Sequence, residues 1–315
     1  MCGRTASTLS PSAIVQACSY NPAAVGTADK LLGGKAATGQ DKVVEAGDGA
    51  EEDSSDTSST LVPVWTEAPC GGQYFPSTNI PPTSYTPILY KSSDQLVLQP
   101  MLWGLVPPWH AGPDPKSHGL TTNNCRLENV MTSKLYKPSL AKGRCVVVCE
   151  GFYEWERSGG VKQPYLVYRA GAEVLYMAGL YSVWRGGEGA PVYNYTIITR
   201  ESNKILSWLH HRMPAFLSPH QFSTWLNSLT PPTKALAMLA LAKEGEVAWH
   251  TVSKEVGNVR NQGMDLMKQV EPCMDDVKKK KEVKVSSASK GIMSNWLKRS
   301  KPEKEGGEKK VKADI

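Results

Sequence analysis

Short runs of apolar and β-branched residues, rather than long helical repeats, dominate the hydrophobic pattern of the chain. Such runs, bounded by Gly, Pro and Ser clusters, are typical of strands with at least one buried face. A short strand-like piece opens the chain, and Ser10 and Pro11 then favour a short helix up to residue 20. We expect further strands at residues 96–106, 144–155, 164–169, 174–184, 193–199 and 247–253, and a rigid loop at 71–92 that leads into a strand.

Helical periodicity is confined to residues 201–209, 220–229 and 233–245, the last of which ends at a capping Gly245. Strands therefore dominate and do not alternate regularly with helices, which argues against a parallel βαβ sheet. The pattern predicts an α+β fold with a large β core and flanking helices.

Two segments lack the composition of a packed core. Residues 27–60 are rich in Gly, Ala, Ser, Asp and Glu, including the acidic run EAGDGAEEDSSD, and we interpret them as a disordered acidic insertion. Residues 273–315 turn to Lys, Ser and Glu and are expected to form a disordered basic tail. One domain would then span residues 2–272.

Composition narrows the classes of function. The formal net charge of +6 and the basic tail suit a nucleic-acid partner, although such a tail is often only solvated. Seven cysteines without CxxC or zinc-type spacing favour reduced thiols inside a cell. No apolar run reaches the ~18 residues of a membrane helix, and no signal peptide is apparent. We expect no metal or cofactor, no membrane association, and a monomer.

Four polar stretches stand where a core would not favour them: Cys2-Gly3-Arg4, TTNNCRLEN at 121–129, EGFYEW at 150–155 and LHHRMP at 209–214. Glu154 between two aromatic residues is suited to proton transfer, or strand alternation simply turns it to solvent. His210 is a candidate acid–base residue or an ordinary surface histidine. Asn124 and Arg126 offer an amide and a phosphate-binding guanidinium.

Together these stretches resemble the SRAP family, named for SOS response-associated peptidase. The likeness rests on MCGR, PSTN followed by Pro, WGLVPPW, NCRLEN, GFYEW and HHRMP, in this order over about residues 2–255. It implies a single SRAP-like domain with a mostly antiparallel, barrel-like β core. It also implies capture of abasic sites in single-stranded DNA at replication forks, in the nucleus.

The resemblance assigns a chemical reason to Cys2. Removal of Met1 would leave an amine and a thiol on adjacent carbons, and only an N-terminal cysteine has this pair. The amine would condense with the aldehyde of an opened abasic sugar, and the thiol would close a thiazolidine ring. By the same resemblance, Asn124 would hold Cys2 and the substrate, Glu154 would shuttle protons, and His210 would protonate the sugar oxygen or the linkage. The expected DNA contacts are Arg4, Arg126, Arg212, Asn79, Trp103 and Trp155, although core packing is equally open for both tryptophans.

Two other classes of function stay open at this point. One is a thiol peptidase or autopeptidase that uses Cys2 as its nucleophile, with Glu154, His210 and Asn124 around it. The other is a non-catalytic reader of modified cytosine, which would need a pocket for a flipped base.

The tail carries a separate signal at residues 290–297. Met293, Trp296 and Leu297 have the spacing of a box that docks into a sliding clamp (PCNA), with Lys290 where such boxes have Gln. The alternative is a chance apolar cluster in a disordered tail.

Overall fold

The computed structural model describes residues 2–21, 60–158, 161–186, 189–239 and 246–271. The predicted acidic insertion, apart from residue 60, lies outside these ranges, as do the basic tail, its clamp-binding residues and Gly245. Contacts divide the chain into two units, of which the first comprises residues 1–156 and 163–270. The helices and strands of the fold belong to that unit, apart from residues 157–158 and 161–162 at the ends of two paired strands.

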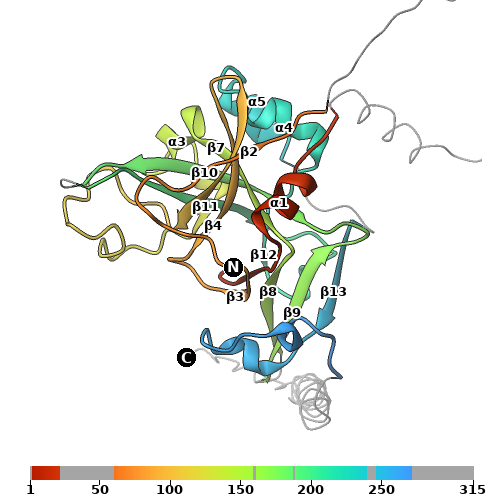
Figure 1. Cartoon of the computed structure of the whole chain (residues 1–315). Helices are drawn as coiled ribbons and strands as arrows, with labels where there is room; N and C mark the ends of the chain where they lie inside the picture. Colours follow the sequence, from red (N-terminus) through yellow and green to blue (C-terminus); the bar gives the residue numbers. More distant parts are fainter. Residues whose placement is uncertain (1, 22–59, 159–160, 187–188, 240–245, 272–315) are drawn as a thin grey trace, which may run out of the picture. The chain divides into compact units, whose positions relative to one another are not determined.

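Two sheets make up most of the fold, which confirms the prediction of a mostly β structure with few helices (Figure 1). The smaller sheet has the strand order β13-β9-β8-β1-β3. Its members are β1 (Thr5–Ser7), β3 (Ser77–Ile80), β8 (Gly151–Ser158), β9 (Val161–Arg169) and β13 (Val247–Thr251).

The larger sheet has the order β12-β11-β10-β7-β4-β5-β2, with β6 paired to β11. A further parallel pairing joins β5 to β11, so that β11, β10, β7, β4 and β5 close into a ring. Its members are β2 (Val64–Trp65), β4 (Tyr85–Ser92), β5 (Gln95–Trp103), β6 (Asn124–Arg126), β7 (Arg144–Cys149), β10 (Leu175–Trp184), β11 (Val192–Glu201) and β12 (Arg212–Pro214).

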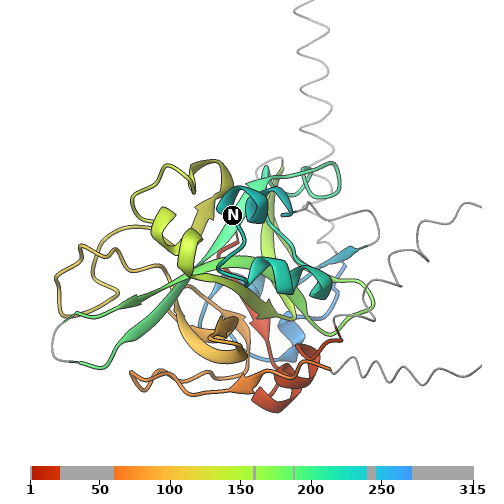
Figure 2. The same ribbon diagram turned by 90° about the horizontal axis from the view of Figure 1, so that it is seen from above.

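Short helices cover one side of this ring. They are α1 (Pro11–Ala17), α3 (Lys137–Lys142), α4 (Pro219–Trp225) and α5 (Pro232–Ala237). Of the 3-10 turns, η1 (Leu127–Asn129) follows β6, whereas η2 (Lys254–Gly257) and η3 (Met264–Leu266) pack against the smaller sheet. Figure 2 shows these short helices and the sheets from above. Buried residues of α1, α4 and α5 share a core cluster with the ring strands. The predicted helix begins at Pro11, and the Ser10 hydroxyl caps it by accepting the N–H of Ala13.

A second core cluster lies between the two sheets and holds the start of the chain in place. It joins Phe152, Val167 and Val247 of the smaller sheet to ring residues such as Trp103 and Tyr195. Cys2 belongs to this cluster and is buried. The N-terminal segment is therefore packed into the interior.

Three sequence predictions differ from the structure. Residues 144–155 form two strands, β7 and β8, which belong to different sheets and separate at Glu150. The expected loop at 71–92 contains the strand β3 as well as β4. Residues 202–211 form turns instead of the predicted helix, because they must lead the chain from β11 back to its antiparallel neighbour β12.

Candidate functional site

The pairing of β1 with β8 brings the start of the chain to Glu154. Thr5 lies opposite Phe152 in an antiparallel register, and the N–H of Tyr153 donates to the carbonyl of Arg4. Continuing this register places the residues before Thr5 alongside Glu154, which is buried. Cys2 and Glu154 are 152 positions apart in the sequence, yet the sheet brings them close together.

The Cys2 thiol lies in a dry, negatively charged environment. Burial raises its pKa to about 12, the charge of Glu154 adds to the rise, and a hydrogen bond from the Arg4 backbone opposes it. Reactive cysteines usually have a lowered pKa. The pKa of the Cys2 thiol is raised instead, so this thiol is protonated at neutral pH. Any reaction at its sulfur therefore needs a nearby base to take the proton, and Glu154 is the carboxylate whose charge acts on it.

Asn124 fixes the backbone of Cys2. Its Nδ2 donates to the carbonyl oxygen of Cys2 at 2.6 Å, and the Nδ2 of Asn123 approaches the same oxygen at 3.4 Å. The Oδ1 of Asn124 is buried and has no hydrogen-bond partner among the residues that the structure describes. An unsatisfied buried acceptor costs about 1–3 kcal/mol, so this oxygen marks a place for a donor from a ligand or from Cys2.

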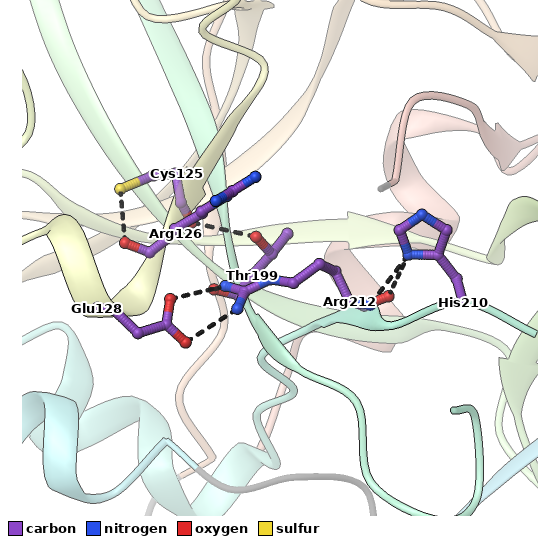
Figure 3. A network of polar contacts seen from close by, with 6 residues as sticks. All are labelled: Cys125, Arg126, Glu128, Thr199, His210 and Arg212. Carbon is purple, nitrogen blue, oxygen red and sulfur yellow. Dashed lines mark hydrogen bonds and ion pairs between the residues drawn. The ribbon is translucent and has the colours of Figure 1, made fainter. Parts of the chain in front are cut away.

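The strand β6 presents Asn124 and Arg126 on one face and Cys125 on the other. It pairs in parallel with β11, with Ile197 opposite Asn124 and Thr199 opposite Arg126. Cys125 is fully buried in the first core cluster. The Arg126 side chain is exposed, and Figure 3 shows its guanidinium pointing away from Glu128. It makes no hydrogen bond within the described ranges and is therefore available for an anion.

His210 lies at the end of the turns that precede β12. Its Nδ1 accepts the N–H of Arg212 at 3.0 Å and lies 3.1 Å from the Arg212 carbonyl (Figure 3). The first contact fits a ring whose proton lies on Nε2, and the second fits a ring with a proton on Nδ1, whether neutral or charged. Burial lowers the pKa of His210 below its ordinary value of 6.5, although the charge of Glu154 acts in the opposite direction. Glu154 is thus close to both Cys2 and His210.

Arg212 links the His210 turn to η1 and β11. Its guanidinium donates to both carboxylate oxygens of Glu128 at 2.9 Å and to the carbonyl of Thr199 at 2.7 Å (Figure 3). The hydrogen bond to Arg212 holds the pKa of Glu128 below its ordinary value. Arg212 was predicted as a DNA contact, but these bonds engage it internally. Glu128 was not predicted at all, because its partner lies far along the chain.

Arg4 and Asn79 form a second internal network. The Nη1 of Arg4 donates to Asn79 Oδ1 at 2.6 Å and to the carbonyl of Val256 at 2.8 Å. The Nδ2 of Asn79 donates to the carbonyls of Asn258 and Asn261 at 2.9 and 3.0 Å. Asn79 is fully buried, which disagrees with its prediction as a direct DNA contact. Together these bonds tie β1, and with it Cys2, to the segment after η2.

The two candidate base-stacking tryptophans differ in their exposure. Trp103 is fully buried, donates from Nε1 to the carbonyl of Asn123, and stacks on Tyr195. The prediction that it stacks on a base is wrong for this structure, since neither face reaches solvent. Trp155 is half-buried, and the Arg4 guanidinium lies 5.9 Å from its ring centre.

The described ranges offer no metal centre, no membrane-spanning helix and no disulfide. They contain no group of three His, Cys, Asp or Glu residues arranged to hold a metal ion. No helix among them has both the length and the apolar composition needed to cross a bilayer. Their six cysteines are free thiols.

Comparisons with known proteins agree on one family. The profile of the family described as SOS response associated peptidase (SRAP) matches residues 1–259. A Xenopus tropicalis protein named abasic site processing protein HMCES is 34% identical over 97% of this chain and 87% of its own length. The Gallus gallus protein of that name is 36% identical over 73% of this chain and 75% of its own. The Escherichia coli abasic site processing protein YedK is 31% identical over 61% of this chain and 84% of its own.

Solved structures support the same fold. A protein from Bacteroides thetaiotaomicron has a TM-score of 0.56 and 23% identity, covering 62% of this chain and 86% of its own. A protein from Bordetella bronchiseptica has a TM-score of 0.52 and 19% identity, covering 59% of this chain and 92% of its own. With the family profile matched over residues 1–259, and with a relative 34% identical over 97% of its length, this chain belongs to the SRAP family.

Proposed function

We propose that this protein captures abasic sites in single-stranded DNA by forming a covalent bond to Cys2. Relatives from animals and bacteria carry the name abasic site processing protein, which supports handling of this lesion. The observation that carries the covalent step is the grouping of Cys2, Asn124, Glu154 and His210. A buried thiol beside a carboxylate, an imidazole and an orphaned amide oxygen is equipped for chemistry rather than for binding alone.

The proposed reaction needs no oxidant or reductant. Removal of Met1 frees the Cys2 amine, which adds to the aldehyde carbon of the opened sugar and gives a carbinolamine. Loss of one water gives the imine. The Cys2 sulfur then adds to the imine carbon, its proton passes to the ring nitrogen, and a thiazolidine results. In sum, one N–C bond and one S–C bond replace the C=O bond, and one water leaves.

Each residue of the group has a task in this sequence. Glu154 takes the thiol proton, which is needed because burial keeps the sulfur protonated. It passes this proton to the ring nitrogen, and in the earlier loss of water it moves a proton from the nitrogen to the departing hydroxyl of the carbinolamine. The unpartnered Oδ1 of Asn124 accepts a hydrogen bond from the Cys2 amine and so directs it to the aldehyde. His210 donates a proton to the sugar oxygen during ring opening and to the linkage during reversal.

A gel experiment separates this proposal from the two alternatives. Purified full-length protein is mixed with single-stranded DNA that carries one abasic site, and the products are run on a denaturing gel without any reductant. A shifted band that survives heating supports the covalent trap. Unshifted, intact DNA would favour a peptidase or a reader of modified bases, and a strand cut without a shift would favour a lyase that only passes through an imine.

His210 provides a pH-dependent prediction. Because the pKa of His210 is lowered from 6.5, the ring is neutral at pH 7 and gains a proton only at lower pH. We expect release of the preformed adduct to accelerate with falling pH in the wild-type protein. His210→Ala should form the adduct but release it more slowly and with a flatter pH profile. Release is measured after adding an excess of competitor abasic DNA, with His220→Ala, at an exposed position in α4, as the control. Equal release rates in both variants would remove His210 from the reversal step.

The proposal assigns different roles to Arg126 and Arg4. Arg126 is exposed and unengaged, so Arg126→Ala should weaken binding of all single-stranded sequences alike. The salt dependence of the binding constant should fall by about 0.7 for the lost phosphate contact. Arg4→Ala should instead mainly lower the melting temperature, because Arg4 is bonded to Asn79 and Val256. An unchanged salt slope for Arg126→Ala, measured by anisotropy over a salt series, would contradict the assignment.

Two further elements of the proposal rest on the sequence and family alone. We infer action at nuclear replication forks from the family resemblance, and docking of residues 290–297 on the PCNA clamp from the spacing of Met293, Trp296 and Leu297. Loss of clamp binding in a Trp296→Ala variant of the full chain is the direct check.

A further inference from the structure

Two exposed tryptophans and a tyrosine pack together, and one of them, Trp208, lies two positions before His210. Trp208 and Trp249 are 41% and 38% exposed, and their ring centres lie 5.7 Å apart at an angle of 50°. Tyr165 meets Trp208 edge-on, with ring centres 5.0 Å apart. Large aromatic side chains are mostly covered in folded proteins, so a group with open faces indicates a binding surface. We call these three residues the aromatic platform.

The platform continues a face of the smaller sheet whose inner part is buried. On β13 and β9, Trp249 pairs with Val167 and Thr251 pairs with Tyr165, so these side chains share one face. On the same face, Val167 and Val247 belong to the core cluster between the sheets. β13 is the edge strand of the smaller sheet. The platform therefore lies at the edge of this face, next to the part that the core cluster buries.

The rings are fixed before any ligand binds. The Nε1 of Trp208 donates to the carbonyl of Ile205 at 2.8 Å, and the N–H of Ile205 donates to the Oδ1 of Asn203 at 3.1 Å. The hydroxyl of Tyr165 donates to Glu156 at 3.2 Å. Side chains held in this way lose little conformational entropy when a ligand stacks on them. The turns at 202–211 thus present Trp208 outward instead of forming a helix.

We propose that the aromatic platform stacks unpaired nucleobases of the DNA strand on one side of the nucleotide held at Cys2. This inference rests on the proposed function. Its location supports a nucleic-acid occupant, because Trp208 stands two residues before His210, on which the charge of Glu154 acts. Aromatic faces bind bases without sequence preference, as a lesion-directed protein requires. Lys204 is exposed on the same turns and supplies an amine for the backbone phosphates.

The test uses undamaged DNA, so that it does not depend on the covalent chemistry. Binding of a fluorescent oligothymidylate to the full-length protein is measured by anisotropy at fixed salt. Trp208→Ala and Trp249→Ala should each weaken binding about ten-fold, the effect expected for losing one stacked base. Trp208→Phe should restore most of the affinity, because it keeps an aromatic face. Leu229→Ala is the control, since Leu229 is 87% exposed in the α4–α5 connection and should not matter.

The outcomes separate this inference from the function on which it rests. Unchanged DNA affinity in both tryptophan variants would overturn the platform, even if the wild-type adduct forms. A loss of concentration-dependent self-association in Trp208→Ala, with DNA affinity intact, would overturn it in favour of an interface between copies. If the wild-type protein forms no adduct but both variants still lose oligothymidylate binding, the covalent function fails and the platform stands.

Discussion

Replacing Cys2 by Ala should abolish the heat-stable adduct with abasic DNA entirely, while non-covalent binding of single strands stays within about two-fold of wild type. The reason is a division of labour: the sulfur closes the ring, whereas guanidinium groups such as that of Arg126 supply phosphate affinity. The measurement pairs a denaturing gel for the adduct with anisotropy for binding. Cys2 is buried and small, so the Ala side chain leaves the packing nearly unchanged.

Two further proteins complete this experiment. Cys18→Ala changes another buried cysteine and should form the adduct at the wild-type rate. A version with an added N-terminal tag keeps the Cys2 thiol but loses its free amine, and it should fail as fully as Cys2→Ala. A tagged protein with normal adduct yield would show that the thiol alone suffices, and the thiazolidine scheme would be wrong.

Replacing Glu154 by Gln should slow adduct formation by about 100-fold, the lower end of what a positioned general acid–base contributes. The Cys2 thiol, with its pKa raised to about 12, is protonated at neutral pH and depends on Glu154 to take its proton. Gln keeps the shape of the side chain but takes up no proton. Removing the charge also lowers the barrier to thiolate formation, so the loss reflects proton transfer after that opposing effect.

The rate is measured under single-turnover conditions with saturating DNA, which separates chemistry from binding. Glu173→Gln changes an exposed glutamate in the turn between β9 and β10 and serves as the matched control. A Glu154→Gln rate within a few-fold of wild type would mean that another group removes the thiol proton.

Much of the fold was predictable because it is encoded locally. Alternating apolar runs indicate strands, and Ser10 with Pro11 indicates the start of α1. The failures all concern long-range structure. The run at 144–155 reads as one strand, but Gly151 lies so close to the Val167 carbonyl that a Cβ there would be 2.8 Å from that oxygen. The run divides at Glu150 because β8 pairs with β9 and β1 and not with the ring strands, which periodicity alone does not encode.

The site shows the same division. Motif likeness identified Cys2, Asn124, Glu154 and His210, and the structure brings them together. The motif likeness did not identify Glu128, because the Arg212–Glu128 pair joins residues 84 positions apart. It did not identify the platform residues either, because the sequence around Trp208 has helical periodicity. Nor did it separate buried from exposed members of a motif. Asn79 and Trp103 match the family pattern, yet they brace the site from the interior.

The central claim is that one thiazolidine ring joins the amine and sulfur of Cys2 to the abasic sugar. The direct test is mass spectrometry of the protease-digested adduct, before and after treatment with borohydride and a thiol-alkylating reagent. The account predicts a modified peptide that begins at Cys2, with the mass of the sugar aldehyde added and one water lost. It should resist both reagents, because neither an imine nor a free thiol is present. A peptide that gains two hydrogens with borohydride, takes up the alkylating reagent at Cys2, or carries the sugar on a lysine would contradict the account.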